Sequence, residues 1–166
     1  MNNKNSSIKK VKSNYNGAVV LGLNDALVEI SGALVGLSFA LAESKIIATV
    51  GIITGFAAAL SMAASEYLSA KEDNRKNPLR ASIYTGIAYL IAVILLVSPY
   101  FILSNVYYST GIMLILVIII IAAYTKYDSK IHNESFKSKF FEMFSITLVV
   151  SVISFLFGML VKKLTG

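Results

Sequence analysis

Five long apolar runs divide this chain, and they constrain its fold more than any other feature. They cover residues 18–42, 46–70, 81–103, 106–124 and 140–160. Each run approaches or exceeds the ~20 residues that an α-helix needs to cross a bilayer. Lipid offers no hydrogen-bond partner to an open backbone, so a segment that spans it is a helix or part of a closed barrel. The sequence therefore predicts an all-α integral membrane protein with five transmembrane helices.

The composition agrees with a chain that consists almost entirely of membrane helices. Of its 166 residues, 56% are hydrophobic and 14% are charged, whereas about a quarter of the residues in a soluble domain are charged. We predict one transmembrane domain over residues 17–166, preceded by a polar segment at residues 1–16. The absence of cysteine excludes disulfides, zinc–thiolate sites and iron–sulfur clusters. No nucleophile–base set, phosphate loop or dinucleotide fingerprint is visible, so an enzyme is not expected.

The polar N-terminal segment contains several lysines and is similar to the basic region of a signal peptide. The apolar run that follows it is too long for a signal peptide, contains two acidic residues and lacks an obvious small-residue cleavage site. We therefore expect a first membrane helix that is retained in the mature protein.

The distribution of Lys and Arg predicts how the helices are oriented. We expect tight turns at residues 43–45 and 104–105, a charged loop at 71–80 and a longer polar loop at 125–139. Twelve of the 15 Lys and Arg residues lie in the N-terminal segment and these two loops, and basic residues concentrate on the cytosolic side of membrane proteins. The N-terminus is therefore predicted to be cytosolic and the C-terminus non-cytosolic. The net charge of +6 is then a topology signal, and no nucleic-acid partner is expected. In a prokaryote, the expected location is the plasma membrane.

Two acidic residues, Asp25 and Glu29, lie inside the first apolar run. Because they are four residues apart, they share one face of a helix, one turn from each other. A charged side chain at the centre of a spanning helix costs roughly 2.5–3.5 kcal/mol on insertion scales. Such residues are expected to face a water-filled path or a bound cation. The alternative is a buried polar contact that sets the helix register.

A second pair, Met62 and Glu66, has the same spacing near the end of the second run. If the first two helices are antiparallel, Asp25 and Met62 lie roughly 10 and 12 Å from the same membrane surface. The four side chains would then form a ladder of metal ligands, with Glu66 nearest the cytosol and Glu29 nearest the midplane. Oxygen and sulfur ligands together suit Fe(II) better than Mg(II) or Ca(II). The alternatives are packing for Met62 and a structural interfacial charge for Glu66.

Other polar and small residues receive mainly structural interpretations. His132, in the loop with Asp128 and Glu134, could bind a metal or be solvated, and Glu142 could approach Glu66 or serve as a helix-start charge. Glycines at 32 and 36, and at 51 and 55, predict close helix contacts. The tyrosines are expected to be interfacial anchors, namely Tyr84, Tyr89, Tyr100, Tyr107, Tyr108 and Tyr124.

Two motifs in this chain resemble those of the vacuolar iron transporter family, whose members transport Fe(II) and Mn(II). The resemblance rests on Gly22-Leu23-Asn24-Asp25-Ala26-Leu27-Val28 and on Ser61-Met62-Ala63-Ala64-Ser65-Glu66-Tyr67-Leu68-Ser69. It implies a homodimer with the metal path between the subunits, and export of metal from the cytosol in exchange for protons. It places Asp25 and Met62 in the pore, with Glu66 as a further candidate. Metal is then the substrate, and no resident cofactor is expected.

The dimer is also expected from the number of ligands. A single acidic pair offers too few ligands to enclose a metal, whereas a two-fold axis beside the first helix would double Asp25, Glu29 and Met62 around one path. The glycines of that helix would permit the two copies to approach closely.

The chain departs from the family pattern in three places. Ala26 stands where many members have glycine, and Glu29 where many have a small hydroxyl residue, so the additional acid could change the ion preference. The link at residues 71–80 also leaves no room for the cytosolic metal-binding domain that some members insert there. We therefore predict a short member of the family. Two alternatives stay open, namely a non-transporting membrane scaffold or partner subunit, and a small cation channel.

Overall fold

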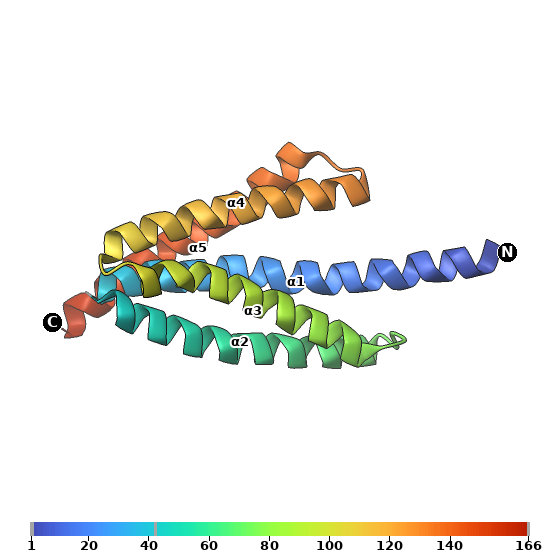
Figure 1. The fold of residues 1–166 in the computed structure, drawn as a ribbon, viewed down its shortest axis with the longest axis horizontal. Coiled ribbons are helices and arrows are strands. Elements are labelled where there is room, and N and C mark those ends of the chain that lie inside the picture. The colour runs from blue at the N-terminus through green and yellow to red at the C-terminus, as the bar shows by residue number, and fades with distance from the viewer. Residues whose placement is uncertain (1, 42, 166) are drawn as a thin grey trace.

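The computed structural model describes the backbone at residues 2–41 and 43–165, and the side chains at residues 16–41, 43–130 and 133–164. Over these residues the chain forms five helices, α1 (Asn2–Ala40), α2 (Ser44–Glu72), α3 (Pro78–Ile102), α4 (Val106–His132) and α5 (Phe136–Thr165) (Figure 1). Each contains a segment of 25 or 29 residues that is long and apolar enough to cross a membrane. The predicted set of five apolar helices is confirmed, as expected of a multi-pass integral membrane protein.

The α1 helix lies at the centre of the bundle and packs mainly against α3 and α5. The α2 helix packs mainly against α3, and its contact with α1 is smaller. In Figure 1, α2 and α4 lie on opposite sides of α1 and diverge from it toward the end where α1 begins. The α1 and α2 helices follow each other in the chain and run antiparallel, but they share only a small contact. Both pack more extensively against α3, which therefore connects them.

The small residues of α1 permit these close contacts within the chain. A Cβ atom added at Gly32 would lie 2.9 Å from Val150 Cγ1, and one added at Gly36 would lie 2.9 Å from the Ser154 carbonyl oxygen. Both neighbours belong to α5, so the prediction that these glycines serve close helix packing is confirmed. The expectation that they provide close approach between two copies of the chain is wrong, because α5 already covers them.

The prediction of a long polar loop at residues 125–139 is wrong, because α4 continues through most of it to His132. Asp128 is buried and forms an ion pair with Lys139 of α5, which also lies 3.2 Å from Glu134. Burial against α5 and this pairing stabilise a helix that extends beyond its apolar part. The helix ends at Asn133, which has a left-handed backbone (φ 54°). His132 is thus helical, and its side chain lies outside the described residues.

The interpretation of the tyrosines as interfacial anchors is wrong for two of them. Tyr89 and Tyr100 are fully buried, whereas Tyr107 and Tyr108 at the start of α4 are 74% and 72% exposed. The Tyr100 hydroxyl donates to Thr110 Oγ1 at 3.0 Å. Because α3 packs between other helices, the hydroxyls of its two buried tyrosines bond to side chains of those helices instead of the headgroup region.

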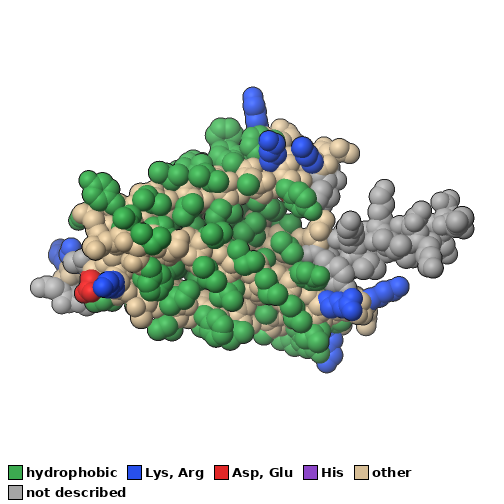
Figure 2. Space-filling view, viewed as in Figure 1, with side chains coloured by type: hydrophobic (Ala, Val, Ile, Leu, Met, Phe, Trp, Pro, Cys, Tyr) green, Lys and Arg blue, Asp and Glu red, His purple; other side chains and the backbone are tan. Residues whose placement is uncertain are grey.

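The basic side chains gather at one end of the bundle. The α2–α3 and α4–α5 connections lie at the end where α1 begins, and the other two connections lie at the opposite end (Figure 1). Figure 2 shows most of the visible Lys and Arg side chains at the first end, with hydrophobic side chains covering the middle of the molecule. This arrangement is the one that the predicted cytosolic orientation requires.

Thiol labelling tests this orientation, and the absence of native cysteine removes any background. Ser138 and Ser104 are both exposed, near the α4–α5 and α3–α4 connections respectively. In intact cells, an impermeant maleimide should label Ser104→Cys and leave Ser138→Cys unlabelled, and both should react after the membrane is permeabilised. The reverse pattern would place the N-terminus outside the cytosol.

Candidate functional site

The two acids of α1 lie on a face that the rest of the chain leaves uncovered. Glu29, near the middle of the spanning segment Asn16–Ala40, is exposed, and Asp25 is half-buried. Leu21 and Ala33, one turn before Asp25 and one turn after Glu29, are also exposed. We call the stripe formed by Leu21, Asp25, Glu29 and Ala33 the open face of α1. A carboxylate at this depth costs roughly 2.5–3.5 kcal/mol if it faces lipid, so the open face requires a cover or a cation.

The partner of Glu29 within the chain is a tyrosine of α3. The Tyr89 hydroxyl donates to Glu29 Oε2 at 2.6 Å, and the Tyr89 side chain is fully buried. One turn earlier in α3, Thr85 Oγ1 donates to the Ala18 carbonyl at 3.0 Å. Since Thr85 and Tyr89 both contact α1, they fix the register of the two helices and hold the acidic stripe beside α3.

Sequence reasoning missed this role of Tyr89. The two residues are 60 positions apart, and no local pattern links them. The single signal in the sequence is the position of Tyr89 well inside an apolar run, where an interfacial anchor would be out of place.

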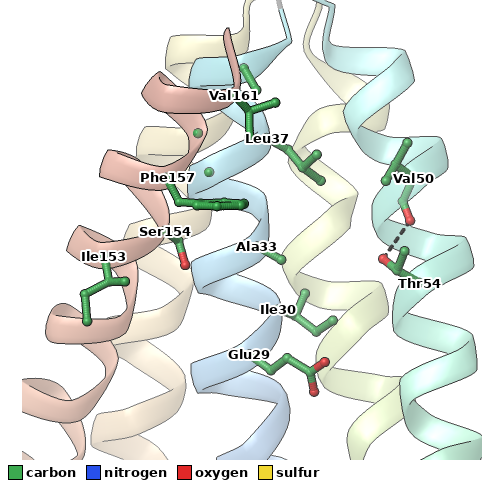
Figure 3. Close-up of a pocket in the computed structure, with 13 residues that line it drawn as sticks. Glu29, Ile30, Ala33, Leu37, Val50, Thr54, Ile153, Ser154, Phe157 and Val161 are labelled. Atoms are coloured by element: carbon green, nitrogen blue, oxygen red, sulfur yellow. Dashed lines mark hydrogen bonds between the residues drawn. The ribbon is translucent and has the colours of Figure 1, made fainter. Parts of the chain in front are cut away.

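A lateral groove extends from Glu29 past Ala33 toward the C-terminal end of α1. It has a volume of about 570 Å³ and lies between α1, α2 and α5. Figure 3 shows the Glu29 carboxylate projecting from α1 on the side of α2, and the Phe157 ring of α5 extending toward α1. Glu29 is the charged member of an otherwise mainly apolar lining, and the hydroxyl of Thr54 is bonded to the Val50 carbonyl of its own helix.

The second predicted pair lies on α2 in a different environment. Met62 is half-buried and packs against the apolar core. Glu66 is buried, and its Oε1 accepts a hydrogen bond of 2.8 Å from Arg75 Nη1. The exposed Glu142 of α5 is not hydrogen-bonded to Glu66 in the described part of the chain.

The four predicted residues form two separate pairs in the chain. Asp25 and Glu29 lie one turn apart on α1, but no hydrogen bond or ion pair among the described residues connects them to Glu66. The described part of the chain also contains no group of three or more His, Cys, Asp or Glu residues that could hold a metal ion. The described part of the chain therefore presents acidic side chains on an open face of α1 without enclosing a metal.

Comparison with known proteins shows a family match over part of this chain. A family model described as the VIT family matches residues 16–76. The matched segment begins with the spanning part of α1, includes all of α2 and ends in the α2–α3 loop. It therefore contains all four predicted site residues. A search of curated proteins found no match.

Proposed function

The match to the VIT family model supports membership of that family, whose members transport metal ions across membranes, and from this premise we propose a more specific function. The protein exports Fe(II) or Mn(II) from the cytosol in exchange for protons, along a path between two copies of the chain. The observation that carries the proposal is the pair of acids on the open face of α1, halfway across a spanning segment.

A second copy of the chain is the cover that this face fits best. A two-fold axis beside α1 would bring two Asp25 and two Glu29 side chains to one path and remove the carboxylates from lipid. The apolar groove between α2 and α5 would flank this path with surface suited to a partner helix. Two copies of Met62 nearby would add sulfur, which favours Fe(II) over Mg(II) or Ca(II).

Exchange for protons follows from the charge of such a path. Four carboxylates in a narrow and poorly solvated space cannot all remain charged without a cation. Either protons or a divalent metal can neutralise them, so metal and protons compete for the same oxygens. If the path opens alternately to the two sides of the membrane, this competition drives metal in one direction and protons in the other.

Proteoliposomes test the transport reaction directly. We expect an imposed proton gradient to accelerate Fe(II) movement toward the acidic side, and we expect Glu29→Gln to reduce this acceleration more than it reduces metal binding. The fluxes of Mn(II), Co(II) and Zn(II), measured in the same vesicles, show which metal ion the protein transports best. If metal flux does not depend on the pH gradient, the protein is better described as a small cation channel. If there is no metal flux, a non-transporting scaffold or partner subunit is favoured.

Cysteine cross-linking tests the dimer separately from transport. Ala33 lies on the open face of α1, whereas Ile115 of α4 is 56% exposed on another helix near the middle of its span. Under mild oxidation in membranes, Ala33→Cys should form a disulfide-linked dimer and Ile115→Cys should remain monomeric. Equal cross-linking at both positions would indicate random collision and would contradict an interface at α1.

A further inference from the structure

Glu66 and Arg75 form an ion pair at the end of α2 that adjoins the α2–α3 loop. The Glu66 side chain is 5% exposed, and its Oε1 lies 2.8 Å from Nη1 of Arg75, whose side chain is 25% exposed. On the outer side of the same guanidinium, Asp73 Oδ2 lies 3.7 Å from Nε. A buried carboxylate is costly unless an opposite charge accompanies it. In the described structure, Arg75 supplies that charge to Glu66.

The backbone of the α2–α3 loop holds Arg75 in this position. Asn74 has a left-handed conformation (φ 52°), and its N–H donates to the Lys71 carbonyl at 3.1 Å. The N–H of Arg75 donates to the Ala70 carbonyl at 2.9 Å. These two bonds form a Schellman motif, which ends a helix and turns the chain back over its last turn. The motif therefore directs the Arg75 side chain toward Glu66 from the loop side.

The ion pair lies between the loop and the level of the α1 acids. Ala18 of α1, Ala70 of α2 and Ala81 of α3 form a small apolar cluster at this end of the bundle. Glu66 is one turn deeper than Ala70 on the same face of α2, and Asp25 is two turns deeper than Ala18 on α1. A cation that approaches Asp25 from the loop end reaches the level of Glu66 first.

We propose that Arg75 is a tethered cation that neutralises Glu66 in the empty protein and is displaced when a divalent metal enters. This inference rests on the proposed transport function. Guanidinium keeps its charge at every physiological pH and pairs closely with carboxylate. A metal ion needs the same carboxylate oxygens and repels the guanidinium, so the two cations exclude each other. The pair keeps a buried carboxylate neutralised without metal, and it lowers the metal affinity at the entrance so that the ion is released inward.

Metal binding to the purified protein in detergent tests the displacement without depending on flux. Free Mn(II), measured by its paramagnetic resonance signal, gives the Kd. Arg75→Gln should lower the Kd for Mn(II) by about tenfold, the factor that corresponds to about 1.4 kcal/mol of competing interaction. Arg75→Lys keeps the charge but loses the planar fork, and its Kd should fall by a smaller factor.

The thermal stability of the same variants gives a second readout. Without metal, Arg75→Gln leaves a buried carboxylate unpaired and should melt at a lower temperature than the parent. Mn(II) should restore the melting temperature of Arg75→Gln and have little effect on the double variant Arg75→Gln with Glu66→Gln. Lys76→Gln removes the same charge from the neighbouring exposed position, and it should match the parent in both measurements.

Several outcomes would overturn the inference. An unchanged Kd in both Arg75→Gln and Arg75→Lys, together with normal flux in the parent protein, would reduce the pair to a structural contact and leave the proposed function intact. If Arg75→Gln fails to fold, the Kd of Arg75→Lys for Mn(II) decides the question, and an unchanged Kd would overturn the inference. A parent protein that neither binds Mn(II) nor transports metal would remove the proposed function and this inference together.

Discussion

Replacing Asp25 with asparagine should abolish metal flux and leave the helix bundle folded. The amide has nearly the shape of the carboxylate but carries no charge, so a divalent cation loses an anionic ligand on the path. A charged side chain at the centre of a spanning helix costs roughly 2.5–3.5 kcal/mol on insertion scales. The substitution removes this charge, so the melting temperature in detergent should not fall. Fe(II) uptake into proteoliposomes and a melting curve of the same preparation measure both effects.

The matched control for Asp25→Asn is Glu142→Gln. Glu142 is an exposed carboxylate near the start of α5, and this substitution removes the same charge from a different helix. We expect nearly normal flux from Glu142→Gln. Near-normal Fe(II) flux in Asp25→Asn would instead remove Asp25 from the path, and with it the central residue of the proposal.

Replacing Gly22 with alanine should disrupt the contact between α1 and α3. It should thereby also change the position of Asp25 and Glu29 relative to α3. A Cβ atom at this position would lie 2.2 Å from the carbonyl oxygen of Thr85. The obstacle is backbone, so α3 itself has to move, and overpacking of this kind typically costs about 1–3 kcal/mol. The displaced α3 should also weaken the Tyr89–Glu29 hydrogen bond. We expect a lower melting temperature and a loss of metal flux.

Gly111→Ala is the control that separates this clash from the general effect of glycine in a helix. Gly111 is a helical glycine of α4, and an added Cβ meets nothing within 4 Å. Alanine there should be neutral or stabilising by about 0.5–1 kcal/mol, because glycine is the poorer helix former. If Gly22→Ala and Gly111→Ala melt at the same temperature, the close approach of α1 to α3 is not a determinant of stability.

The ends of the helices show where hydropathy stops being informative. The apolar runs located all five helices, but α4 extends eight residues past the run at 106–124. Its polar last turns are stabilised by burial against α5 and by the Asp128–Lys139 pair. The turns after α2 and α4 are marked by left-handed Asn74 and Asn133. Hydropathy marks the part of each helix that lies in the hydrocarbon core of the bilayer. The position at which the helix ends depends instead on these left-handed backbone conformations.

The sequence by itself determined the number of membrane helices, the concentration of basic charge at one end and the shared face of Asp25 and Glu29, because these depend on local composition and spacing. The tertiary structure alone decided which helices touch. In lipid, a side chain facing a neighbouring helix is as apolar as one facing the bilayer, so small residues and hydrogen bonds select the partners. That selection covers Gly32 and Gly36 with α5, brings Tyr89 to Glu29 and directs Arg75 to Glu66. The spacing of Gly32 and Gly36 indicates a close helix contact but not which helix makes it. No pattern along the chain pairs Tyr89 with Glu29 or Arg75 with Glu66, because these contacts depend on how separate segments are placed in space.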